Sequence, residues 1–219
     1  MDARPSRTGD TRPEDQGGIL DALLGQLGVT GATVLGHSLG ADVAVALAER
    51  GGKVGKLIVI DEGPDYTVAN PPAVNTVLRL PGLGRLMYRT LPAFAFRIAL
   101  ESFFAPGYRL ADAFDTPGPA VDDARAVPYA CFLSSQAEKQ RFVAQTPLDD
   151  RLRALGLSTL VIFGDRDRVY RSAESCARYR AVANVRIEVI PDAGHSPMLE
   201  APRQTADAIR AFLGGNPLV

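Results

Sequence analysis

The stretch ATVLGHSLGADVAVALAER, Ala32–Arg50, decides the fold of this chain. A short apolar run, Ala32–Leu35, is bounded by a turn that contains Ser38. From Leu39 to about Arg50 the apolar residues then recur almost without interruption, as in a buried helix. The stretch predicts a strand, a tight turn and a helix, with a serine at the turn, where it contributes nothing to stability.

Two glycines flank this serine. Gly36 and Gly40 stand two residues before and after Ser38, and we expect that neither places a side chain where strand and helix pack closest. Such a turn holds a serine in a strained conformation with its hydroxyl exposed at the strand end. The backbone N–H of Leu39, at the start of the helix, is then placed to stabilise negative charge on a substrate oxygen. The pattern is therefore typical of a nucleophile, although the string G-x-S-x-G alone also arises by chance.

The rest of the chain alternates between strand and helix patterns. Short β-branched runs predict strands, and longer amphipathic runs predict helices. This alternation favours an α/β fold with a mostly parallel sheet flanked by helices. The expected strands are 32–35, 56–60, 159–163 and 185–190, and the expected helices are 13–28, 39–50, one within 166–182, and 201–213.

Residues 71–150, called here the middle segment, break this alternation. They carry apolar residues at helical spacing, with Pro81, Pro92 and Pro106 as breakers, and no strand pattern. We therefore expect residues 1–70 and 151–219 to form the core and residues 71–150 to form an inserted helical cap. Aromatic and soft apolar side chains of the cap are expected at the roof of an apolar pocket, unless they only pack the cap helices together: Met87, Tyr88, Phe94, Phe96, Phe103, Phe104 and Tyr108. A cap that rests on a membrane is a weaker alternative, since Arg85, Arg89 and Arg97 flank the apolar positions.

Composition excludes several classes of function. The 219 residues are 46% hydrophobic and carry a net charge of −1, with charges of both signs scattered along the chain. No basic block is available to neutralise nucleic acid, and no apolar run reaches membrane-spanning length. Cys131 and Cys176 are too few for a disulfide framework, which favours a cytoplasmic protein. No metal or nucleotide motif is present, so we expect a small-molecule substrate and no cofactor.

A serine nucleophile needs a base, and the chain contains only two histidines. His37 adjoins Ser38, and neighbouring side chains of a turn point apart, so it is a poor candidate. His195 lies in PDAGHSP, directly after the last expected strand, where the carboxyl ends of the strands gather. His195 is therefore the expected base; the alternative is a loop histidine packed by Pro197.

The base in turn needs a carboxylate that fixes its tautomer. The run VIFGDRDRV ends a strand with Asp165 and Asp167. We expect Asp167 to be this acid, because Gly164 lets the chain turn and bring that carboxylate back over the strand end. Asp165 is expected to cap the next helix or to pair with a neighbouring arginine. The alternative acids are Asp61 and Glu62, which follow the neighbouring strand.

Together these segments resemble the α/β-hydrolase superfamily with a helical cap. The resemblance rests on LGHSLGADVAVALA, LIVIDEGP, TLVIFGDRD and DAGHSPMLEAP, in the order serine, acid, histidine. It implies Ser38 as nucleophile, Asp167 as acid, His195 as base and the Leu39 amide as one oxyanion donor. It disfavours dehalogenase and epoxide hydrolase chemistry, for which the superfamily carries aspartate in place of Ser38.

The chain also departs from the superfamily pattern. About 30 residues precede the Ala32 strand, where the family usually has further strands and a His-Gly segment that supplies the second oxyanion amide. Asp2 and Arg4 match a family loop, but Pro5 and Arg7 stand where glycines belong. An apolar strand left at the sheet edge invites pairing with another chain, for example as a homodimer. Two functions stay open: a serine hydrolase acting on an ester-like or activated carbonyl of a small apolar substrate, and a noncatalytic or truncated domain completed by a partner.

Overall fold

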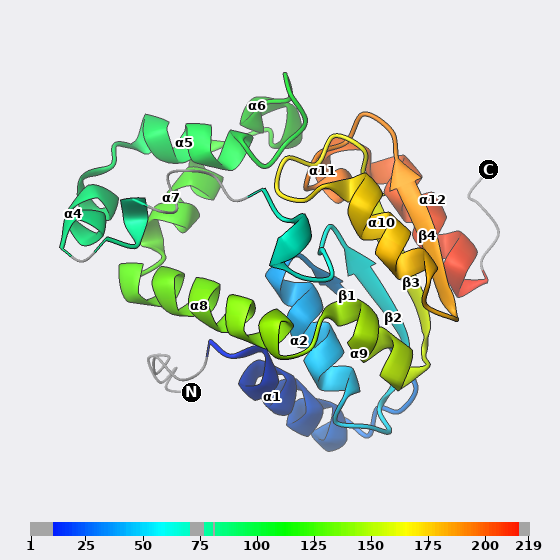
Figure 1. Ribbon diagram of the computed structural model, residues 1–219. Helices are drawn as coiled ribbons and strands as arrows, with labels where there is room; N and C mark the ends of the chain where they lie inside the picture. The colour runs from blue at the N-terminus through cyan, green and yellow to red at the C-terminus, as the bar shows by residue number, and fades with distance from the viewer. Residues whose placement is uncertain (1–10, 71–76, 81, 215–219) are drawn as a thin grey trace.

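The computed structural model describes residues 11–70, 77–80 and 82–214. Four strands form one sheet in the order β1-β2-β3-β4, and each pair of neighbours is parallel (Figure 1). Their bounds are β1 Ala32–His37, β2 Val54–Ile60, β3 Ser158–Gly164 and β4 Val185–Ile190. The predicted parallel α/β architecture is confirmed, and β1 to β3 each extend slightly beyond the runs recognised in the sequence. The family-like loop around Asp2 and Arg7 and the expected start of the middle segment at residue 71 lie outside the described residues.

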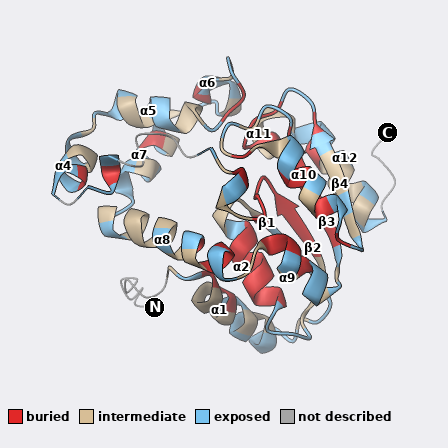
Figure 2. Cartoon of the chain, viewed as in Figure 1, coloured by how far each residue is buried: buried red, intermediate tan, exposed pale blue. Residues whose placement is uncertain are grey.

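Alternation along the central strands divides their side chains between two faces. Because successive residues of a strand point to opposite sides, Leu57 and Val59 of β2 face one layer of helices, and Ile58 and Ile60 face the other. The first layer contains α2 (Leu39–Ala48), α9 (Leu148–Leu155) and α10 (Ser172–Arg180). The second layer contains α11 (Pro197–Glu200) and α12 (Pro202–Leu213). Burial is concentrated on β2, β3 and α2, at the centre of the fold (Figure 2).

Strand β1 forms one edge of the sheet that the described residues make. Leu35 of β1 lies beside Ile58 in the register, on the face that α12 covers. Helix α12 packs near β3 and β4, so Leu35 stays 47% exposed. Helix α1 (Pro13–Gln26) packs against α2, on the other side of the sheet from α12. A Cβ on Gly17 of α1 would lie 2.8 Å from the Leu47 nitrogen, so the two helices approach closely at this glycine. The edge strand expected from the sequence is therefore present.

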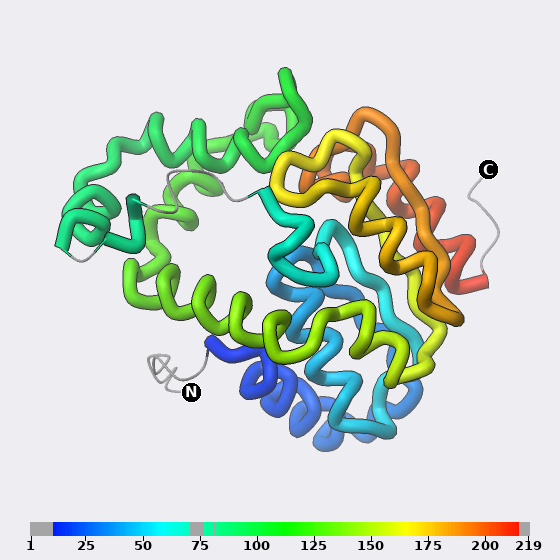
Figure 3. Tube along the Cα trace, in the orientation of Figure 1, coloured from blue at the N-terminus to red at the C-terminus, as the bar shows by residue number. Residues whose placement is uncertain are grey.

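The described part of the middle segment contains helices and no strand. They are α4 (Leu83–Thr90), α5 (Ala93–Glu101), α6 (Leu110–Ala113), α7 (Gly118–Ala126) and α8 (Tyr129–Gln145), preceded in the chain by the short helix η1 (Tyr66–Val68). In Figure 3 the chain leaves the sheet after β2, passes through these helices and returns through α8. Phe142 and Val143, near the end of α8, belong to the main core. No described helix combines the length and the apolar character needed to cross a membrane.

A buried charge cluster joins α8 to the core. Lys139 of α8 is only 6% exposed; its ammonium donates to Glu62 and lies 4.0 Å from Asp42 of α2. The Tyr170 hydroxyl donates to the other oxygen of Glu62. Burial alone would lower the pKa of Lys139, but the carboxylates of Glu62 and Asp42 outweigh it and raise that pKa. Burial, followed by repulsion from Glu62, raises the pKa of Asp42, so the cluster is close to neutral when Asp42 holds its proton.

Replacing Lys139 with methionine is expected to destabilise the fold by about 3–5 kcal/mol, because Glu62 is then left charged and buried without its cation. Arg141→Met is the matched control on the same helix. The Arg141 side chain is 34% exposed and pairs with Glu14 and Glu138, so its loss should cost about 1 kcal/mol or less. Urea unfolding followed by circular dichroism gives both free energies of unfolding. Equal losses for the two variants would show that the buried cluster contributes no more than a surface ion pair.

Candidate active site

Ser38 occupies a strained turn between β1 and α2. Its φ is +50° and its ψ −127°, a conformation that costs a residue with a side chain about 1–3 kcal/mol. The turn is held by a hydrogen bond of 2.9 Å from the Ser38 nitrogen to the Ile60 oxygen. A Cβ on Gly36 would lie 2.2 Å from the Gly40 oxygen, so strand and helix can approach this closely only at a glycine. Gly40 itself faces open space among the described residues, so our sequence-based expectation of close packing is right for Gly36 and wrong for Gly40.

Three side chains distant in the sequence meet beside this turn. His195 Nε2 lies 3.0 Å from Ser38 Oγ, and His195 Nδ1 lies 2.9 Å from Asp167 Oδ2. His195 is only 2% exposed, so it is not the surface-loop histidine of the alternative interpretation. Because Nδ1 faces a carboxylate, the neutral imidazole carries its proton there and leaves Nε2 free to accept the serine proton.

The middle segment contacts the loop that carries His195. The His195 nitrogen donates to the Phe103 oxygen over 2.8 Å, and the two rings lie 5.8 Å apart. A Cβ on Gly194 would lie 2.3 Å from the Ala105 nitrogen, so glycine is required there. Among the aromatic residues expected at a pocket roof, Phe103 makes this ring contact with His195. Phe104 is instead buried in a cluster that includes Tyr108.

Glu200 of α11 fixes the same loop and was missed in the sequence. Its carboxylate accepts hydrogen bonds from the backbone nitrogens of Gly194 (3.0 Å), Ser196 (3.2 Å) and Ala105 (2.7 Å). The available signal was an acidic residue inside DAGHSPMLEAP, five positions after His195. Two of the donors come from its own loop and one from the middle segment, so Glu200 links the two.

His37 contacts the backbone of the loop that carries His195. Its Nε2 donates to the His195 backbone oxygen at 2.6 Å. Burial, followed by the nearby His195 side chain, lowers the pKa of His37 to about 4. Because this pKa lies below the ordinary value of 6.5, the folded protein favours the neutral form of His37. The stability that depends on the neutral form is complete above pH 6.5 and is lost as the pH falls towards 4.

Asp167 accepts backbone hydrogen bonds that orient it. Its Oδ1 accepts from the nitrogens of Val169 (2.6 Å) and Tyr170 (3.2 Å), which leaves Oδ2 for His195. Asp165 accepts instead from the Asp192 nitrogen at 2.7 Å. It does not cap α10, but it pairs with Arg166 at 3.8 Å, which was the other expected outcome. The chain turns after Gly164 as expected, with the Asp167 nitrogen donating to the Gly164 oxygen at 3.3 Å. Glycine is also required there because a Cβ would lie 2.1 Å from the Gly194 oxygen.

The alternative acids have different surroundings. Glu62 is engaged by Lys139 and Tyr170, as described above, and so belongs to the buried cluster. Asp61 is fully buried with φ +46°, and its Oδ1 accepts from the Gly164 nitrogen at 2.9 Å. Burial, followed by repulsion from Asp167, raises the pKa of Asp61, so the protonated form is favoured.

Among the described residues, one group of side chains could hold a metal ion, and it consists of Asp61, Asp167 and His195. One potential ligand atom from each lies within 4.8 Å of the others. The nitrogen of His195 that faces Asp167 is already hydrogen-bonded to it, so a cation bound there would have to replace this contact. As it stands, the arrangement suits proton transfer between a histidine and a carboxylate.

Leu39 begins α2 directly after Ser38. The first amides of a helix have no acceptor within the helix, and they carry the positive end of its dipole. The Leu39 N–H is therefore free of the helical hydrogen-bond ladder and adjoins the serine, as an oxyanion donor requires.

Comparison with known proteins places this geometry in a family. The sequence matches the alpha/beta hydrolase family over residues 3–208. The chain belongs to this family. As an alpha/beta hydrolase, it has the parallel sheet flanked by helices that its sequence resemblance implied.

Individual relatives of this alpha/beta hydrolase are distant. Human monoacylglycerol lipase ABHD6 is 30% identical over 82 residues, which are 37% of this chain and 23% of that protein, so the match spans about a quarter of the relative. A bromoperoxidase from Bacillus anthracis superposes with a TM-score of 0.73 at 18% identity, over 97% of this chain and 77% of that one. An esterase from Thermogutta terrifontis superposes with a TM-score of 0.67 at 25% identity, over 93% of this chain and 72% of that one.

Proposed function

We propose that this alpha/beta hydrolase is a serine hydrolase that cleaves an ester-like or activated carbonyl bond through an acyl-enzyme on Ser38. The observation that carries the proposal is the continuous line of contacts from Ser38 Oγ through the His195 ring to Asp167. A hydroxyl, an imidazole and a carboxylate in this order are the groups needed for nucleophilic acyl transfer.

The reaction follows from the positions of these groups. His195 Nε2 takes the proton of Ser38 as Oγ bonds to the carbonyl carbon, and the Leu39 amide stabilises the charge that develops on the carbonyl oxygen. The imidazolium, stabilised by Asp167, then protonates the leaving alcohol as its bond to carbon breaks. Water loses a proton to His195 as it attacks the acyl-serine carbonyl. His195 then returns that proton to Ser38 Oγ as the bond between Oγ and the acyl carbon breaks, which releases the acid and free Ser38.

The surroundings of the triad favour a small apolar acyl group. The Phe103 and Tyr170 rings both pack near the His195 ring, at centroid distances of 5.8 and 6.0 Å. Phe103 remains 39% exposed and so presents apolar surface beside the triad. The names of the Thermogutta esterase and the human lipase are in keeping with an ester substrate. A cytoplasmic location stays part of the proposal, since Cys131 and Cys176 are free thiols.

A second candidate function is a noncatalytic domain completed by another chain at the β1 edge. It is favoured by the half-exposed Leu35 on that edge strand. A homodimer through β1 is one form of this proposal. It predicts that the isolated chain folds without turning over any ester.

Hydrolysis of nitrophenyl esters distinguishes the serine hydrolase from the noncatalytic domain. We expect the purified chain to release nitrophenolate from acetate, butyrate and hexanoate esters, with a lower KM for the longer acyl groups because more apolar surface is buried. Peptide mass analysis of acid-quenched reactions should find the acyl group on the peptide that contains Ser38. A folded protein with no turnover above the buffer rate would favour the noncatalytic domain.

A further inference from the structure

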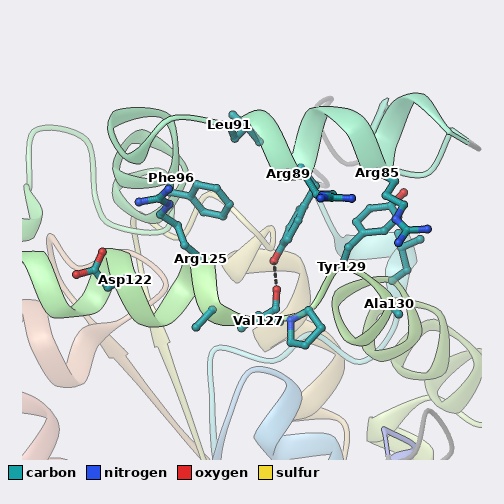
Figure 4. A pocket seen from close by; sticks show the side chains of 13 residues that line it. Arg85, Arg89, Leu91, Phe96, Asp122, Arg125, Val127, Tyr129 and Ala130 are labelled. Carbon is teal, nitrogen blue, oxygen red and sulfur yellow. Dashed lines mark hydrogen bonds between the residues drawn. The ribbon is translucent and has the colours of Figure 1, made fainter.

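The middle segment contains a pocket of about 920 Å³ that is separate from the triad. Its walls come from α4, α5, α7 and α8, and none of Ser38, Asp167 and His195 lines it. A pocket of this size is in the range that binds small molecules. Figure 4 shows Arg85 and Arg89 on one helix, Arg125 with Phe96 farther along, and Tyr129 below the first two arginines.

Aromatic rings form a fixed apolar wall in this pocket. The Tyr88 ring lies 5.6 Å from Phe96, edge to face, and 5.4 Å from Tyr129. The Tyr88 hydroxyl donates to the Val127 oxygen at 2.9 Å, and the Tyr129 hydroxyl donates to the Leu78 oxygen at 2.6 Å. Because both hydroxyls are already engaged, the surface that these rings offer to a ligand is mainly apolar.

The charged groups around this wall are mostly cationic. Arg85, Arg89 and Arg125 line the pocket, and Asp122 is the only acidic residue in its lining. Within residues 11–70, 77–80 and 82–214, none of the three arginines makes an ion pair or a side-chain hydrogen bond, whereas Arg97 on the next helix pairs with Glu101. Three guanidinium groups and one carboxylate therefore line this pocket, so its lining carries an excess of positive charge.

Arg85 and Arg89 are four residues apart on α4 and so occupy the same face of that helix. Like charges at this spacing repel each other, and an anion between them relieves the repulsion. The same two side chains also border an adjoining hollow of about 670 Å³, lined in addition by Gly82, Leu86 and Thr90. The guanidinium pair is therefore open to a ligand, and guanidinium forms paired hydrogen bonds with carboxylate and phosphate.

We propose that this pocket binds an anionic amphiphile: a carboxylate or phosphate head held by Arg85 and Arg89, with an apolar body against Tyr88 and Phe96. The site does not depend on the reaction proposed for Ser38. The same chemistry is offered by a free fatty acid or alkyl phosphate and by an acidic lipid in a bilayer. The free amphiphile is favoured because the aromatic wall lies inside a pocket rather than on a flat face.

Calorimetric titration with decanoate, decyl phosphate and decanol tests the proposal on the Ser38→Ala protein, so that turnover does not interfere. The two anions should bind at least tenfold more tightly than the uncharged decanol. The double variant Arg85→Gln/Arg89→Gln should lose at least tenfold in affinity for the anions and leave decanol unchanged. Arg97→Gln, which removes an exposed arginine outside this pocket, is the matched control and should bind as the parent does.

Sedimentation with vesicles distinguishes the two sources of the ligand. Binding to phosphatidylglycerol vesicles but not to phosphatidylcholine vesicles, lost in the double variant, would support the same head-group site and identify the bilayer as its source. Anion binding that the double variant leaves intact would overturn the site, and so would the absence of binding to both amphiphiles and vesicles. Circular dichroism establishes that each variant is folded. These binding outcomes do not depend on whether the wild-type protein hydrolyses esters.

Discussion

Replacing Ser38 with alanine is expected to lower kcat for nitrophenyl ester hydrolysis by about 10⁴-fold or more, because it removes the hydroxyl that contacts His195 Nε2. His195 Nε2 would then lose the group that lies 3.0 Å away, while its contact with Asp167 remains. Stability should not fall with activity, since alanine adds no atoms to the turn and Ser38 makes no side-chain cap to α2.

The control for this variant is Ser102→Ala. Ser102 lies at the end of α5, next to Phe103, and its hydroxyl donates to the Ala99 oxygen of its own helix. Its replacement should change kcat less than about twofold. Activity retained by the Ser38 variant in initial-rate measurements would show that the reaction uses another nucleophile.

Asp167→Asn is expected to lower kcat by about 10⁴-fold, because an amide in place of the carboxylate no longer fixes the histidine tautomer or stabilises the imidazolium. Asp61→Asn is the sharpest comparison, since both carboxylates lie in the same buried group. The pKa of Asp61 is raised by burial and by Asp167, and an amide resembles a protonated carboxyl in shape and charge. The Asp61 variant should therefore keep activity within about tenfold of the wild type.

Steady-state kinetics of the two asparagine variants at pH 8 decides between the carboxylates. A large loss in the Asp61 variant together with a small loss in the Asp167 variant would move the acid to the end of β2. Equal large losses would mean that the two carboxylates act as one unit. Thermal melting of both proteins shows whether either loss reflects unfolding.

Local sequence patterns were sufficient for the four strands and for α1, α2, α10 and α12, but not for the individual helices of the middle segment. The strands have short runs rich in β-branched residues, and their alternation with helices restricts the topology to a parallel sheet. Strand β1 continues to His37, beyond the run recognised at Leu35, because Gly36 and His37 pair with Val59 and Ile60. A glycine and a histidine carry no strand signal of their own, so this extension depends on the neighbouring strand.

Contacts between segments that are distant in the sequence could not be predicted from local sequence patterns. Lys139 lies in a polar stretch of α8, and only its position against Glu62 and Asp42 makes it part of the core. Glu200 acquires its role because Ala105 of the middle segment approaches the histidine loop. The sequence favoured Asp167 over Asp61 as the acid, but the different surroundings of the two carboxylates emerge only from the packing of β2 against β3.

The central claim is that Ser38 is an activated nucleophile, and covalent labelling tests it most directly. After treatment with a fluorophosphonate, intact-mass and peptide analysis of the folded wild type should show one adduct, on Ser38. The Ser38→Ala protein should take up none, and the His195→Ala protein should be labelled far more slowly. A folded wild type that stays unlabelled, or an adduct on a different residue, would contradict the account.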